Sequence, residues 1–228
     1  MIEHVYRRAA AAHAVTRVIV ATDDRRIAEA VAAFGGHAVM TSAAHPTGTD
    51  RLAEVALGLD CDIVVNVQGD EPLVAPSMID QAVAPLAADP ALQMSSLRTR
   101  LTSLAEYLDP NVVKVVVDHA DVALYFSRAP IPHRRDPEAA DQPPAGAWRH
   151  IGLYAYRRTF LPLFAGLPPT ALEQAERLEQ LRALEHGYRI VVPETRHRSV
   201  GVDTPSDLAE VEALVANGDA DFKGHPTR

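Results

Sequence analysis

The chain of 228 residues contains a single cysteine, Cys61. One cysteine can form neither an internal disulfide nor a multi-thiol metal site, so the sequence fits a protein of the reducing cytoplasm. The chain also lacks a block of Lys or Arg, and its 22 basic residues against 30 acidic ones give a formal net charge of −8. This balance argues against a partner held mainly by phosphate-backbone charge, such as nucleic acid or an anionic membrane surface.

Long apolar runs are absent as well. Apolar runs such as 115–117 and 122–126 fall far short of the ~20 residues that a membrane-spanning helix needs. Near the N-terminus, His13 and Arg17 interrupt any continuous apolar segment, which argues against a secretory signal. We therefore expect a cytoplasmic protein with no membrane partner.

Short β-branched runs alternate with alanine-rich stretches through the first part of the sequence. This alternation is typical of an α/β fold with a mostly parallel sheet flanked by helices. Apolar periodicity predicts helices over 1–13, 24–34 and 50–57, and strands over 17–22, 37–41 and 62–68. The continuous apolar run of the last strand favours a central position in the sheet. Each strand ends in a polar loop, and in open α/β sheets such loops line one ligand-binding crevice.

The second half predicts an antiparallel hairpin and then further α/β elements. Two apolar runs separated by a short turn indicate hairpin strands over 112–118 and 122–127, followed by an exposed loop over 130–147. The later elements are expected as a strand over 150–156, a helix over 171–186, a strand over 189–193 and a helix over 205–216. We interpret 1–216 as one domain with the hairpin inserted at about 111–156, and 217–228 as a tail.

An acidic loop follows the third predicted strand. Gly69 lets the backbone turn closely around a ligand, and Asp70 offers a hard oxygen donor suited to Mg²⁺. The alternative is that Asp70 or Glu71 only caps the next helix, and for this motif alone the two interpretations weigh equally.

A second acidic residue precedes the last predicted helix. Thr204 and Asp207 resemble a capping box around Pro205, so they are explained by helix initiation alone. Asp203 has no part in that cap. Two carboxylates on separate loops, Asp70 and Asp203, can form a Mg²⁺ site that also accepts phosphate oxygens.

A third group surrounds the start of the helix predicted at 50–57. Gly48 lies between threonines, so backbone N–H groups and hydroxyls are free to face a base, a ribose or a phosphate. An ordinary capped loop is the simpler alternative. The candidates on this nucleotide side are Thr22, Asp23, His45, Gly48, Thr49 and Arg51.

A fourth group supplies cations and hydroxyl-binding side chains. Arg128 and Arg149 have the forked guanidinium geometry that holds a carboxylate, whereas Glu179 and Gln180 can bond sugar hydroxyls. Surface ion pairs for the arginines, and ordinary strand packing for Tyr154, are the structural alternatives.

These groups occur together and in order, and with them the sequence resembles the 3-deoxy-manno-octulosonate cytidylyltransferase family, which forms CMP-Kdo for lipopolysaccharide synthesis. The matching segments are ATDD, HPTGTDR, VNVQGDEP, DPNVVKVV, ALYFSRAPIP, RHIGLYAYRR, LEQLRALEHG and GVDTPSDL. The resemblance implies a cytoplasmic homodimeric enzyme that transfers CMP from CTP to Kdo, with Mg²⁺ as cofactor. It implies metal-binding and catalytic roles for Asp70 and Asp203. The implied sugar-acid contacts are Gln68, Arg128, His150, Tyr154, Glu179 and Gln180, and the implied cytidine side is Thr22, Asp23, His45, Gly48 and Thr49.

One departure from the family changes the expectation about activity. Its members begin with a strand and a loop of the form P-A-R-x-x-S-T-R-L-P-G-K-P-L that holds the triphosphate, and this chain starts at the equivalent of the following helix. We therefore expect either that Met1 is not the physiological start or that the chain is a weak or inactive catalyst. A non-catalytic nucleotide or sugar-acid binder, and a cytidylyltransferase for another acid sugar, remain as alternatives.

Overall fold

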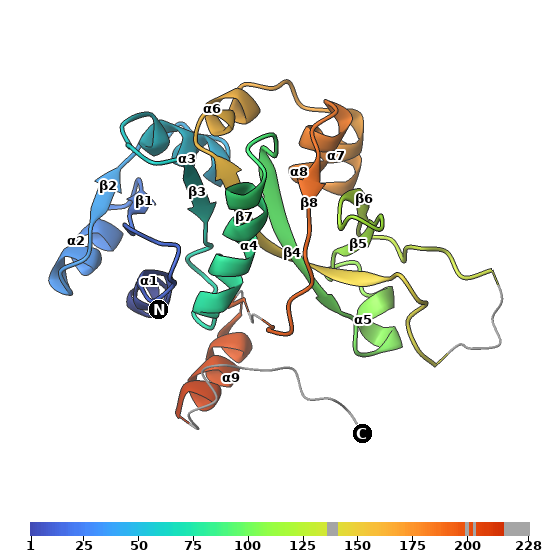
Figure 1. Ribbon diagram of the computed structural model, residues 1–228. Coiled ribbons are helices and arrows are strands. Elements are labelled where there is room, and N and C mark those ends of the chain that lie inside the picture. The colour runs from blue at the N-terminus through green and yellow to red at the C-terminus, as the bar shows by residue number, and fades with distance from the viewer. Residues whose placement is uncertain (136–140, 199–200, 203, 217–228) are drawn as a thin grey trace.

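The computed structural model describes residues 1–135, 141–198, 201–202 and 204–216 (Figure 1). Its helices are α1 (Ile2–Ala10), α2 (Arg25–Ala33), α3 (Gly48–Leu57), α4 (Pro76–Ala88), α5 (Leu104–Leu108), α6 (Phe160–Ala165), α7 (Ala171–Glu176), α8 (Gln180–Glu185) and α9 (Pro205–Ala216). Its strands are β1 (Val20–Thr22), β2 (Ala38–Met40), β3 (Ile63–Asn66), β4 (Met94–Arg100), β5 (Lys114–Val117), β6 (Ala123–Ser127), β7 (Trp148–Arg157) and β8 (Ile190–Val191). None of the helices in these ranges is long and apolar enough to cross a membrane.

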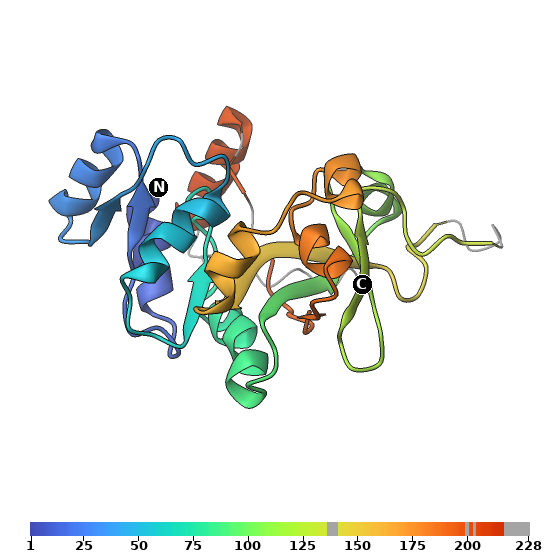
Figure 2. The ribbon, with the colours of Figure 1, turned by 90° about the horizontal axis from the view of Figure 1, so that it is seen from above.

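Strand β7 organises the larger sheet. It runs antiparallel to β3, β4 and β5, while β6 extends the sheet beyond β5 and β8 pairs in parallel with β4. Strands β1 and β2 form a separate parallel pair. Seen from above, β7 crosses the middle of the molecule, between the N-terminal elements and the β5–β6 hairpin (Figure 2). The α/β class is thus confirmed, but the sheet is mixed rather than mostly parallel, because β7 is antiparallel to each of its neighbours.

Helices cover both faces of this sheet. Alternate residues of β7 point to opposite faces, so Ile151 and Ala155 pack in one core with α1 and α4, whereas Tyr156 packs in the other. That second core also holds Phe164 from α6 and Leu181 from α8. Since the polar side chains of β7 lie among these apolar ones, the packing of both cores fixes where they point.

Several predicted elements are confirmed. The hairpin forms as β5 and β6, and α9 begins and ends at the predicted residues. Asp24 caps α2 through its side chain, and Gly35 takes the left-handed conformation, with φ of 78°, where that helix stops. The predicted tail, 217–228, and positions 136–140 of the predicted loop lie outside the described residues.

Two predictions about secondary structure are wrong. The helix expected over 171–186 is two helices, because Arg177 adopts a left-handed conformation with φ of 55° between α7 and α8. The strand expected to be central, β3, pairs only with β7 among the described residues. Strand β4 was not predicted at all, because buried polar residues such as Ser95, Ser96 and Arg98 break its apolar pattern.

Candidate active site

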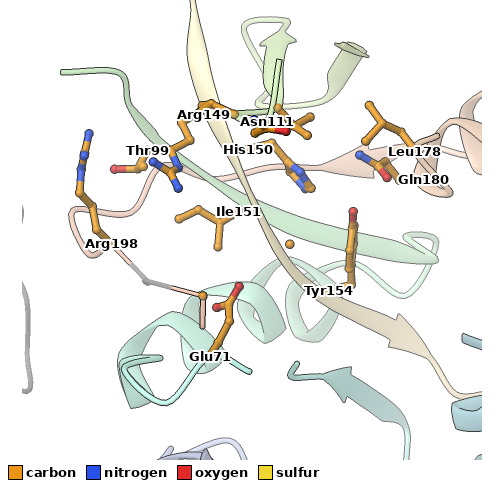
Figure 3. Close-up of a pocket in the computed structure, with 14 residues that line it drawn as sticks. Glu71, Thr99, Asn111, Arg149, His150, Ile151, Tyr154, Leu178, Gln180 and Arg198 are labelled. Carbon is orange, nitrogen blue, oxygen red and sulfur yellow. The ribbon is translucent and has the colours of Figure 1, made fainter. Parts of the chain in front are cut away.

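A cavity of about 360 Å³ opens beside β7 (Figure 3). Small-molecule sites usually occupy roughly 300–1,000 Å³, so its size suits a sugar-sized ligand. Most of its side chains are polar, and they come from β4, β7, the segments after β3 and β8, the loop before β5 and the start of α8. The polar lining side chains are Glu71, Thr99, Asn111, Arg149, His150, Tyr154, Gln180 and Arg198.

His150 is a neutral group in the wall of this cavity. Its side chain is buried, its Nε2 lies 2.9 Å from the Ser96 hydroxyl, and its ring meets Phe126 edge to face. Ser96 Oγ also lies 2.9 Å from the carbonyl oxygen of Ile151. A hydroxyl has one hydrogen, and Ser96 donates it to this carbonyl. We therefore assign a hydrogen to His150 Nε2, which donates it to Ser96 Oγ. Burial lowers the pKa of His150 to about 3, which leaves Nδ1 as an acceptor at neutral pH.

Tyr154 follows on the same face of β7. Burial, and then the nearby Glu179 carboxylate, raises the pKa of Tyr154 well above its usual range. The phenol therefore stays protonated and can donate a hydrogen bond. Tyr154 and His150 lie with their ring centroids 5.5 Å apart, so both point from β7 toward the cavity (Figure 3).

The break between α7 and α8 determines the positions of Glu179 and Gln180. Because α8 starts anew after the left-handed Arg177, Gln180 is its first residue, buried against the cavity (Figure 3). Its Nε2 has no hydrogen-bond partner among the described residues. Glu179 accepts a hydrogen bond from the Thr49 hydroxyl at 2.5 Å and lies 3.8 Å from Arg182. A buried amide without a partner is rare, so Gln180 is suited to bond a ligand oxygen.

Two arginines of the cavity meet on one carboxylate. Glu106 Oε1 accepts from Arg149 Nη1 at 3.2 Å and from Arg198 Nη1 at 2.9 Å. Burial alone would raise the pKa of Glu106, but hydrogen bonds from Arg198 and Thr102 outweigh it and lower the pKa to about 2. Glu106 is therefore ionised at neutral pH, and two guanidinium groups against one carboxylate leave this wall with positive charge.

The candidates for the nucleotide side lie around the ends of β1 and β2 and the start of α3. Arg51, in α3, bonds the Thr41 hydroxyl at 2.5 Å and pairs with Asp23 at 3.1 Å, so it connects the residues that directly follow β1 and β2. Thr22 is buried at the end of β1, and His45 contacts Glu54. The remaining members, which open α3 directly after its N-cap, are Gly48 and Thr49.

The acidic loop after β3 approaches the segment that leads to α9. The carbonyl oxygen of Asp70 accepts the backbone N–H of Val202 at 2.9 Å. Asp203, the next residue in the sequence, lies outside the described residues. Within the described ranges, no group of three or more His, Cys, Asp or Glu side chains could hold a metal ion. Gln68 is exposed, with its amide 3.3 Å from the Asn66 side chain, and does not line the cavity.

Arg128 lies beside the cavity rather than in its lining. Its Nε donates to the Glu176 carbonyl at 2.8 Å, and its Nη1 donates to the Pro110 carbonyl at 3.1 Å. Pro110 precedes Asn111, which lines the cavity. Of the arginines predicted to hold a carboxylate, Arg149 is therefore the one that the cavity exposes directly.

Four polar lining residues were missed from the sequence as site residues, namely Glu71, Thr99, Asn111 and Arg198. Glu71 and Asn111 lie inside motifs that were already singled out for other residues, so they could have been included. Thr99 and Arg198 belong to no motif, and only the pairing of β4 with β7 and the path of the chain after β8 bring them to the cavity.

The fold is thus a mixed sheet flanked by helices, with a polar cavity beside its central strand β7. The chain belongs to the cytidylyltransferase family, whose sequence pattern matches residues 1–190. Its relatives include proteins named 3-deoxy-manno-octulosonate cytidylyltransferase. The one from Geobacter metallireducens is 58% identical over 92% of this chain and 85% of its own length, and the one from Syntrophotalea carbinolica is 59% identical over 93% and 87%.

A solved structure agrees with these sequence relatives. It is described as a CMP:2-keto-3-deoxy-manno-octonic acid synthetase complexed with CTP. It is 44% identical to this chain and superposes with a TM-score of 0.88, covering 95% of this chain and 88% of the other. The family resemblance inferred from the motifs is therefore confirmed.

Proposed function

We propose that this chain transfers CMP from CTP to 3-deoxy-manno-octulosonate (Kdo), forming CMP-Kdo and pyrophosphate. The observation that supports it most is the cavity at β7, where Arg149, His150, Tyr154 and Gln180 converge. A cationic group, a neutral acceptor, a phenol and an unpartnered amide match the carboxylate and hydroxyls of an acid sugar. The relatives at 58–59% identity, which are named for this reaction, support the same substrate pair.

The proposed reaction is a single displacement. The anomeric oxygen of Kdo forms a bond to the α-phosphorus of CTP, the bond from that phosphorus to the bridging oxygen breaks, and pyrophosphate leaves with that oxygen. The proton of the anomeric hydroxyl passes to solvent, and no covalent enzyme intermediate forms. Such transfers depend on positioning and on neutralising charge, so the protein's part is to orient the two anions and offset their charge.

The roles divide between two groups of residues. Kdo is proposed to lie on Arg149, His150, Tyr154 and Gln180, with Glu179, Gln68 and Arg128 as further contacts from the resemblance. The cytidine side is proposed to be formed by Thr22, Asp23, His45, Gly48, Thr49 and Arg51. The hydrogen bond between Thr49 and Glu179 supports the proposal that the two sides are adjacent, because it joins a residue of one group to a residue of the other.

Mg²⁺ is the proposed cofactor, with Asp70 and Asp203 as the residues that would hold it. The donor set fits, since Mg²⁺ prefers one or two carboxylates together with substrate phosphate oxygens. The bond from Val202 N–H to the Asp70 carbonyl supports the pairing, because it brings the residue next to Asp203 to the Asp70 loop. When bound, the ion would neutralise charge on the transferred phosphoryl group.

Both substrates are anions, whereas the chain carries a formal charge of −8. Local cations must therefore offset the overall field near the site. Arg149, Arg198 and Arg128 supply such charge beside the cavity. A homodimer located in the cytoplasm is proposed on the resemblance, with sedimentation of the purified chain as the test of the dimer.

The direct test supplies CTP, Mg²⁺ and Kdo and measures pyrophosphate release together with CMP-Kdo. The 8-amino analogue of Kdo and sialic acid serve as competing acceptors. Turnover with Kdo above both supports the proposal. Binding of Kdo without turnover would identify a non-catalytic binder, and preferred turnover of another acid would reassign the substrate.

A further inference from the structure

We propose that Glu106 is a positioning residue for the sugar acid, which holds Arg149 in the orientation that meets the substrate carboxylate. Arg198 keeps Glu106 in place from the opposite side. This inference rests on the proposed function, since it concerns how the same cavity selects an acid.

Glu106 is itself firmly held. It lies in α5, where its backbone N–H donates to the hydroxyl of the N-cap Ser103 at 3.2 Å. Its Oε2 accepts from the backbone N–H of Thr102 at 2.7 Å and from the Thr102 hydroxyl at 2.8 Å. The carboxylate therefore has a fixed position before either arginine is considered.

Arg198 completes that fixation. Its Nη1 and Nη2 lie 2.9 and 3.2 Å from the two oxygens of Glu106, a paired geometry that is stronger and more directional than one contact. Nη2 also donates to the Arg100 carbonyl at 3.0 Å and to the Thr102 hydroxyl at 3.1 Å. With so many protein partners, Arg198 is committed mainly to structure.

Arg149 is bound differently. The single hydrogen bond that its side chain makes to the described residues is the 3.2 Å contact from Nη1 to Glu106. Nε and Nη2 are left for a ligand, and the side chain faces the cavity (Figure 3). One contact fixes the direction of a long, flexible side chain while leaving its remaining donors for a carboxylate.

The burial of the three groups favours this interpretation over an ordinary surface ion pair. The side chains of Glu106 and Arg198 are 18% and 17% exposed, and that of Arg149 is 33% exposed. Exposed pairs contribute little because water screens them. Here Glu106 and Arg198 are shielded from water, and Arg149 extends from Glu106 into the cavity.

The test compares four proteins: wild type, Glu106→Gln, Arg149→Ala and the double variant. Each is assayed at saturating CTP with varied Kdo or its neutral methyl ester, and at saturating Kdo with varied CTP. We expect Glu106→Gln to raise KM for Kdo about tenfold, the scale of one charged hydrogen bond, with kcat and the KM for CTP nearly unchanged. The preference for acid over ester should fall in the same variant, because a misdirected Arg149 no longer distinguishes the two.

The double variant tests whether Glu106 acts through Arg149. If Glu106 acts through Arg149, adding Glu106→Gln to Arg149→Ala should raise KM for Kdo no further. Additive losses, or an unchanged KM and acid preference in Glu106→Gln, would overturn the inference. Glu194→Gln is the matched control, since Glu194 pairs with Arg100 at 3.0 Å on the surface and is not part of the cavity lining.

Two further experiments cover a variant that does not fold and a wild type that forms no CMP-Kdo. If Glu106→Gln does not fold, Glu106→Asp shortens the same acid by one methylene, and it should keep the fold but raise KM for Kdo. If the wild type forms no CMP-Kdo, the proposed function fails, and calorimetric binding of Kdo and its ester to the same four proteins then decides the role of Glu106. Loss of the acid preference in that binding supports the inference, and equal binding in all four overturns it.

Discussion

Thr49 and Glu179 are 130 residues apart in the sequence, yet the Thr49 hydroxyl donates to Glu179 Oε2 at 2.5 Å. Thr49 is in the first turn of α3, and Glu179 is the N-cap of α8. The bond therefore joins the proposed nucleotide side to the proposed sugar side. A change at either residue should affect the binding of both substrates.

Thr49→Val keeps the shape of the side chain and removes its hydroxyl. Losing a hydrogen bond to a charged group should lower the free energy of unfolding by about 1.5–3 kcal/mol. It should also raise KM for both CTP and Kdo. Urea unfolding and steady-state kinetics measure these effects, and Thr49→Ser, which keeps the hydroxyl, should resemble the wild type. A valine variant with wild-type kinetics would show that the bond does not couple the two sides.

Asp70→Asn and Asp203→Asn test the proposed metal ligands. Each substitution removes one charged oxygen ligand and keeps the volume of the side chain, so the melting temperature should change little. Turnover should fall by roughly 100-fold, the scale of losing one group that stabilises developing charge. Asp60→Asn is the control, because Asp60 is an exposed aspartate shortly before β3 rather than after it. Turnover that is insensitive to Mg²⁺ in the wild type would refute the assignment.

Arg128→Ala tests the second arginine. Its Nη2 has no hydrogen bond to the described residues, so the proposal that it contacts the sugar acid predicts a rise in KM for Kdo of roughly 10- to 150-fold. KM for CTP should change much less. Because Arg128 also bonds the carbonyls of Glu176 and Pro110, the variant should melt at a lower temperature. Equal losses for both substrates would indicate a purely structural role.

The sequence predicted some of the elements that have local signals, whereas helices α4, α5 and α6 were not predicted. The hairpin of β5 and β6 follows from two apolar runs and a short turn, and α9 follows from the Thr204 and Asp207 cap. Strand β4 was missed because its Ser95, Ser96 and Arg98 are buried by contacts with distant segments. Arg98, for instance, pairs with Asp121 at 2.7 Å and lies over the ring of Trp148.

In the candidate site, too, residues in local motifs were predicted and a residue held by distant contacts was missed. Arg149, His150, Tyr154 and Gln180 lie in motifs, were predicted, and meet in one cavity. Arg198 was missed because an isolated arginine after a short strand carries no local signal. Its place depends on an ion pair with Glu106, 92 positions earlier in the chain. Long-range pairing of this kind, like the antiparallel direction of β7, is set by tertiary contacts that sequence periodicity does not reveal.

The buried neutral His150 predicts a specific dependence of stability on pH. Burial lowers its pKa from the ordinary 6.5 to about 3 in the folded protein. Between those values the unfolded chain binds a proton that the folded protein does not. The stability associated with the neutral ring is therefore fully present above pH 6.5 and is lost progressively as the pH falls toward 3.

His150→Gln removes this titration while keeping a polar group beside Ser96. The free energy of unfolding, measured in urea at intervals from pH 7 to pH 4, should fall less steeply for the variant than for the wild type. His119→Gln, at an exposed turn, shows whether removing any histidine has that effect. Parallel curves for His150→Gln and the wild type would mean that His150 accepts a proton in the folded state. A charged ring in the cavity would then be a third cation for the sugar acid, and KM for Kdo should fall as the pH is lowered.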